Sequence, residues 1–207
     1  MLKSGKTKLA PPPPTANLTF MEVVAYVVSC LAILWSFGGG HLPEVFWSRV
    51  FIAGPLCLVT ALVLLKTRKE LKILKPHSGS WMMGIGIGLV MFLVGILLAW
   101  FNKEKTAQLS DLSHYKIAGL LAWAFILSPA CEIIYRHVLA PSWGIKSSAF
   151  IEALSFGVGA VNFYLFLIVF VWGYIGSRLS MRFGIVASMV ARGLATLLLI
   201  ISLQAVL

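Results

Sequence analysis

Residues 126–144 read ILSPACEIIYRHVLAPSWG, an apolar run that carries Glu132, Arg136 and His137 in its middle. An ionised side chain inside a core or a membrane is costly unless another group neutralises it. Glu132 and Arg136 are four residues apart with the acid first, the order that favours an ion pair along one helix face. The stretch therefore predicts a helix whose charged side chains face partners inside a bundle.

The composition around this stretch is typical of an integral membrane protein. The chain has 207 residues, of which 59% are hydrophobic and 12% are charged, and its mean hydropathy is +0.93. Soluble domains contain about a quarter charged residues. The net charge is +10, but the basic residues flank apolar runs, where they are typical of cytoplasmic anchors. We therefore expect a lipid bilayer as the surroundings and no nucleic-acid partner.

The hydrophobic runs predict an all-α, polytopic membrane bundle of six to seven transmembrane helices. They lie at 18–37, 45–65, 81–101, 115–139, 147–161, 162–180 and 183–206. Because about 20 apolar residues cross a bilayer, the fifth and sixth runs are short, and we expect them to be tilted, re-entrant or joined as a hairpin. Residues 1–17 are expected to form a flexible basic and proline-rich tail, and residues 18–207 a single transmembrane domain.

The distribution of lysine and arginine predicts the orientation. The N-terminal tail and residues 66–75 and 178–182 are basic, whereas the turn at 38–44 has no lysine or arginine. Cytoplasmic loops of membrane proteins carry an excess of these residues. The pattern predicts a multi-pass protein with its N-terminus in the cytoplasm. Within the third run, Gly84 and Gly88 form a pair suited to close packing against another helix.

Four charged residues lie inside the later spans, namely Glu132, Arg136, Glu152 and Arg192. Each would cost about 2.5–3.5 kcal/mol at mid-bilayer if it were unpaired. A local pair between Glu132 and Arg136 is one interpretation, with Tyr135 hydrogen-bonded to the same carboxylate. The other interpretation is a network across helices, in which Arg192 neutralises Glu132 or Glu152.

Two prolines flank these charges. Pro129 removes a helix hydrogen bond and is expected to kink the span, because proline has no N–H. Pro141 is expected either to close the helix or to start the next turn.

The segment CEIIYRHVL resembles the first motif of the CPBP intramembrane proteases, which include the CAAX prenyl endopeptidases and bacteriocin self-immunity proteins. That motif is Glu-Glu-x-x-x-Arg, and its three positions hold Cys131, Glu132 and Arg136 here. Further on, ALSFGVGAVNF is similar to the second motif, Phe-x-x-x-His, with Phe156 in place and Ala160 at the histidine position.

A third stretch is similar to the family's His-x-x-x-Asn/Asp motif, with Arg192 at the histidine position and Thr196 at the Asn/Asp position. The resemblance covers residues 115–200 and implies a helical membrane fold with an intramembrane endopeptidase site. In the family, the first glutamate of the pair is taken to activate water, assisted by the two histidines and the asparagine.

The departures from the motifs imply an inactive member. Cys131, Ala160, Arg192 and Thr196 stand at the four working positions. Without an imidazole at either motif position, proton transfer and metal ligation lose their groups, so we expect no metal and no cofactor. The resemblance then implies a protein that binds or scaffolds another membrane protein or a lipidated peptide.

Three other interpretations remain open. An active CAAX-type endopeptidase could use Glu132, or Glu152, as its base. Cys131 could replace the carboxylate as a nucleophile if a neighbouring group activated its thiol. A small transporter or lipid-handling protein is the third, although Glu22 and Arg49 are the only charges in the first three runs, which argues against an ion path.

Overall fold

The computed structural model describes residues 19–37, 43–68, 74, 79–100, 121–159 and 163–206. Within these ranges the fold is helical and contains no strand, so the all-α prediction is confirmed. The predicted tail, residues 1–17, lies outside the described residues. The helices in chain order are α1 (Phe20–Phe37), α2 (Pro43–Thr67), α3 (Ser80–Trp100), α6 (Ser128–Cys131), α7 (Ala140–Trp143), α8 (Ile145–Gly159), α9 (Phe163–Phe183) and α10 (Ile185–Val206).

The helices follow the hydrophobic runs closely. Ser48–Thr67, Ser80–Leu98 and Phe163–Phe183 are long and apolar enough to cross a membrane, and Phe20–Ser36 and Ile185–Leu199 are shorter apolar helices. The expectation of a short sixth span is wrong, because α9 extends over 21 residues, to Phe183. It continues past residue 180 through Met181, Arg182 and Phe183, which the hydrophobic run did not include.

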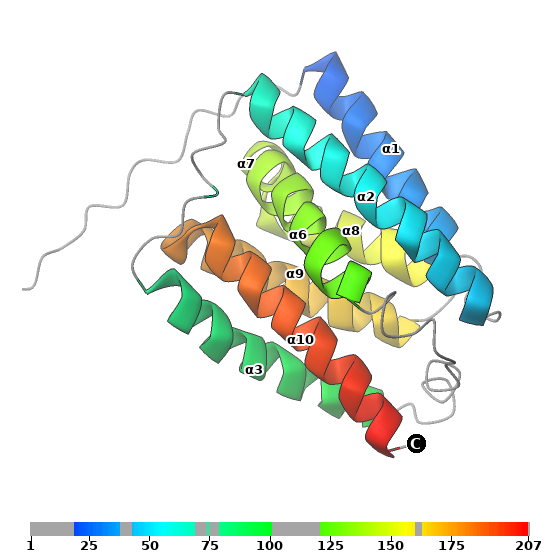
Figure 1. Ribbon diagram of the computed structural model, residues 1–207. Helices are drawn as coiled ribbons and strands as arrows, with labels where there is room; N and C mark the ends of the chain where they lie inside the picture. Colours follow the sequence, from blue (N-terminus) through cyan, green and yellow to red (C-terminus); the bar gives the residue numbers. More distant parts are fainter. Residues whose placement is uncertain are drawn as a thin grey trace, which may run out of the picture.

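Residues 121–143 form a central rod, in which two wide π-helical turns, η2 (Trp123–Leu127) and η3 (Glu132–Leu139), alternate with α6 and α7. Figure 1 shows this rod between the α1–α2 pair on one side and α9 and α10 on the other. α8 packs on α1 and α9, and α3 packs on the outer side of α10. The rod therefore lies where the other helices can enclose its charged residues.

The wide turns have a local cause. Each precedes a proline, Pro129 or Pro141, whose missing N–H leaves the regular helix ladder incomplete. In η3 the Ala140 N–H donates to the Tyr135 carbonyl, five residues back. Ser148 of α8 donates its hydroxyl to the same carbonyl. The helix therefore continues through Pro141, the second residue of α7. The rod ends at Gly144, whose φ of 86° lets the chain reverse into α8.

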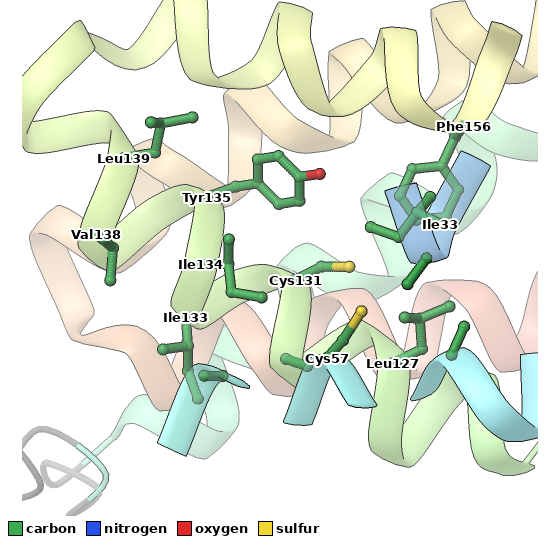
Figure 2. Packing of buried hydrophobic residues seen from close by; sticks show 14 of the residues in the cluster. Ile33, Cys57, Leu127, Cys131, Ile133, Ile134, Tyr135, Val138, Leu139 and Phe156 are labelled. Atoms are coloured by element: carbon green, nitrogen blue, oxygen red, sulfur yellow. The ribbon is translucent and has the colours of Figure 1, made fainter. Parts of the chain in front are cut away.

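The rod supplies the centre of the hydrophobic core. Figure 2 shows Tyr135, Ile134 and Cys131 of the rod packed among Cys57 of α2 and Phe156 of α8. All five side chains are buried. This apolar packing encloses one side of the rod and leaves its charges to face α8, α9 and α10.

The prediction of close packing at Gly84 and Gly88 is confirmed. A Cβ on Gly84 would lie 2.8 Å from the Ala187 carbonyl oxygen, and one on Gly88 would lie 2.8 Å from that of Ala191. The two glycines therefore let the backbone of α3 approach α10.

Candidate functional site

Four charged side chains from three segments meet at the centre of the bundle. Glu132 and Arg136 lie on η3, Glu152 on α8 and Arg192 on α10, and all four are buried. We call these four residues the central charge cluster. Arg192 Nη1 lies 3.1 Å from Glu132 Oε1 and also contacts Glu152 Oε1. Its guanidinium therefore bridges carboxylates from two different segments.

Arg136 joins the same carboxylates from the other side. Its Nη2 donates to Glu152 Oε2, whereas its Nε lies 3.6 Å from Glu132 Oε2. The local ion pair between Glu132 and Arg136 is thus present, but its N–O distance is too long for a hydrogen bond. Arg136 donates its direct hydrogen bond to Glu152 of α8 instead. With two acids and two bases, the cluster has no formal net charge.

Two glycines of α9 make room for the cluster. A Cβ on Gly173 would lie 2.8 Å from Arg136 Nη2 and 3.0 Å from Glu152 Oε2. A Cβ on Gly176 would lie 3.1 Å from Glu132 Oε2. Larger residues would push α9 away from the charges, so both glycines are needed for the enclosure.

Ser188 of α10 is a further member of the site that sequence reasoning missed. Its hydroxyl donates to Glu132 Oε2 and also lies 3.1 Å from the Gly176 carbonyl oxygen. A hydroxyl has one proton, so it serves one acceptor at a time. Ser188 precedes Arg192 by four residues and therefore shares its helix face, which was the available signal.

Part of Arg136 is not hydrogen-bonded within the described residues. Nε and Nη1 have no hydrogen-bond acceptor there, although the side chain is fully buried. Glu152 Oε1 meets Arg192 as an ion pair rather than as an aligned hydrogen bond. Each arginine thus makes one aligned hydrogen bond to one carboxylate of the cluster and one further ion pair to the other.

The other predicted site residues lie around the cluster. Phe156 lies beneath Arg192, with the guanidinium carbon 5.7 Å from its ring centre. Thr196 is buried one turn further along α10, and Cys131 is a buried free thiol in the apolar core. Ala160 lies outside the described residues. The described residues contain no group of three His, Cys, Asp or Glu side chains that could hold a metal ion.

The expectation that Tyr135 hydrogen-bonds the Glu132 carboxylate is wrong. Its hydroxyl lies 3.4 Å from Cys30 Sγ of α1 and 3.5 Å from Ser155 Oγ of α8, to which it donates. The physical reason is direction, because Tyr135 faces the α1 side of the rod, away from α10. Its ring also meets Tyr26 edge-on, with 5.9 Å between ring centres.

Comparison with known proteins yields no relative: no family model, no curated protein and no solved structure matches this chain.

Proposed function

We propose that the chain is a multi-pass membrane protein of six to seven spans with a CPBP-like fold, and that it binds or scaffolds a membrane partner without cleaving it. The distribution of side chains supports membrane insertion, because charges are buried and large apolar residues are exposed. Large apolar side chains exposed on the surface include Phe20, Leu31, Phe51, Ile52, Met82, Leu93, Phe125 and Phe163.

The convergence of the motif positions supports the CPBP-like placement. Glu132 and Arg136 from the first motif, Phe156 from the second and Arg192 from the third meet in one place. Positions far apart in sequence would come together in this way if the three motifs built one site. The same geometry explains why the site would not cleave peptides.

The proposal rests on one observation, namely that both carboxylate oxygens of Glu132 are already engaged by other side chains. A general base needs an oxygen directed at the proton that it removes. Here Oε1 accepts from Arg192 and Oε2 accepts from Ser188, and the side chain is fully buried. The carboxylate therefore acts as a structural anion that holds α10 against the rod. A bundle held in one arrangement in this way suits a binding or scaffolding role, with a membrane protein or lipidated peptide as the partner.

The second candidate is an active endopeptidase in which Glu132 is the base, and cleavage assays separate the two. Full-length protein in nanodiscs is incubated with a prenylated CAAX-type peptide and with a transmembrane peptide. We expect no cleavage above that of empty nanodiscs. Turnover that is lost in Glu132→Gln would overturn the binding proposal.

The matched control for that assay is Glu22→Gln. Glu22 is also a buried acid, paired with Arg68 at the start of α1. If Glu22→Gln abolished cleavage as fully as Glu132→Gln, the loss would report on folding and not on a base.

A further inference from the structure

The charged residues outside the central cluster are distributed unevenly between the two ends of the bundle. Lys66 and Arg68 lie at the end of α2, Lys146 lies in the first turn of α8, and Arg178 and Arg182 lie near the end of α9. All are basic. We call this the basic end.

The helix ends concerned lie on the same side of the molecule. Ser80, the first residue of α3, donates its hydroxyl to the Phe183 carbonyl at the last residue of α9, with a distance of 2.9 Å. α3 follows α2 in the chain, and α8 packs along α9. Figure 1 shows the end of α2, the turn after α7 and the turn between α9 and α10 at the same end of the bundle.

Little negative charge offsets the basic end. Glu22 is the acid described there, and Arg68 binds its carboxylate. Glu22 is engaged further by the Thr19 N–H, which donates to it at 2.8 Å. Among the described residues, Lys66, Lys146, Arg178 and Arg182 are therefore left without an acidic partner.

Arg178 is held in place although it is exposed. Its guanidinium carbon lies 5.4 Å from the ring centre of Tyr174, and its Nη2 donates to the Tyr174 hydroxyl at 3.0 Å. Arg182 follows one turn later on the same helix face. A guanidinium fixed by an aromatic ring keeps further N–H groups to bind phosphate oxygens, at a smaller entropic cost than a free side chain.

Exposed apolar side chains lie beside these arginines. Met181 and Phe183 are 55% and 36% exposed in the same last turns of α9. A segment that presents guanidinium groups and apolar side chains together matches the boundary between lipid headgroups and acyl chains.

We propose that the Tyr174–Arg178–Arg182 face of α9 binds the phosphate headgroup of an anionic phospholipid. The arginines contact the phosphate, and the exposed Met181 and Phe183 lie beside them at the level of the headgroups. This inference rests on the membrane insertion proposed above, and it does not depend on whether the central cluster is catalytic.

The test compares lipid binding to the full chain in detergent by native mass spectrometry, using phosphatidylglycerol against phosphatidylcholine. We expect preferential retention of phosphatidylglycerol. Each surface-proximal arginine contributes about fivefold in affinity, so Arg178→Gln with Arg182→Gln should lower retention about 25-fold. Retention that is unchanged in this double variant, or an absence of preference in the wild type, would overturn the proposal.

The matched control is Arg49→Gln. Arg49 also stacks on an aromatic ring, with its guanidinium carbon 5.2 Å from the ring centre of Trp35, and it donates to the Trp35 carbonyl at 3.1 Å. It lies near the start of α2, at the opposite end of the bundle. Retention should be unchanged in this variant, and an equal loss would show that the basic end has no special role.

Two further measurements distinguish lipid phosphate from free phosphate, and distinguish a failure of this inference from a failure of the membrane proposal. Inorganic phosphate should not displace the lipid, and full displacement would assign the site to free phosphate instead. Reconstitution into nanodiscs tests the membrane proposal separately. A chain that remains soluble without detergent and does not enter nanodiscs refutes membrane insertion, whereas one that enters them without lipid preference refutes only this inference.

Discussion

Arg192 is the residue that ties α10 to the central charge cluster. Its guanidinium contacts carboxylates from η3 and α8 at once, and it is almost fully buried. Without it, Glu132 and Glu152 would share Arg136 and leave one buried negative charge uncompensated. Removing one partner of a buried pair is far more damaging than replacing the whole pair, because the remaining charge has no solvent.

We predict that Arg192→Met destabilises the protein by about 3–5 kcal/mol. Adding Glu152→Gln should recover part of this loss, because the cluster is then neutral again with Glu132 and Arg136. Thermal unfolding in detergent, followed by the monodisperse fraction, measures both variants. Arg178→Met, an equivalent change at an exposed position, should leave the midpoint close to that of the wild type. A double variant no more stable than Arg192→Met would contradict the pairing.

At the scale of elements, the central rod shows why the spacing of Glu132 and Arg136 along one helix did not predict the hydrogen-bond partner of Arg136. Four residues separate Glu132 from Arg136, which favours an ion pair on a regular helix. The wide turn over Glu132–Leu139 changes the rotation per residue, and Arg136 donates to Glu152 across the Gly144 turn instead. The prolines that accompany the wide turns were visible in the sequence, but the bonding pattern that results depends on Ser148 and the neighbouring helices.

The contact between α3 and α10 allows a prediction with a control on the same helix. Gly88→Leu should separate the helices and lower the unfolding midpoint, because a Cβ there already lies 2.8 Å from a backbone oxygen and 3.3 Å from the Leu194 Cβ. Gly86→Leu adds the same side chain two residues away, where no atom lies within 4 Å of a Cβ. Gly86→Leu should be close to neutral. Equal midpoints for the two variants would show that this helix contact contributes little to stability.

At the scale of the whole molecule, the basic end and the exposed apolar surface suggest one orientation in a membrane. From the positive-inside rule we expect the basic end to face the cytoplasm, which is the orientation that the sequence predicts. Lys146 and Ser48 are both exposed and lie toward opposite ends, on α8 and α2. They therefore provide a matched pair of positions for labelling.

We predict that Lys146→Cys reacts with a membrane-impermeant maleimide only from the cytoplasmic side, and Ser48→Cys only from the other side. The native cysteines are replaced by alanine in both variants, and sealed vesicles of known orientation are labelled before and after permeabilisation. Labelling of both positions from one side would contradict a membrane-spanning α2 or the arrangement of the ends.

The sequence by itself determined the helices and the burial of charge. Hydrophobic runs and their flanking residues are local properties, so α1, α2, α3, α8 and α10 could be predicted to within a few residues. The cost of an isolated charge among apolar residues also made it predictable that Glu132, Arg136, Glu152 and Arg192 need partners.

Only the tertiary structure decided which groups meet. Arg192 and Glu132 are 60 residues apart, and Arg136 and Glu152 are 16 apart. Ser188 reaches Glu132 because Gly176 lets α9 and α10 close over the rod. Such contacts depend on how helices rotate and approach one another, and sequence spacing along one helix contains no information about either.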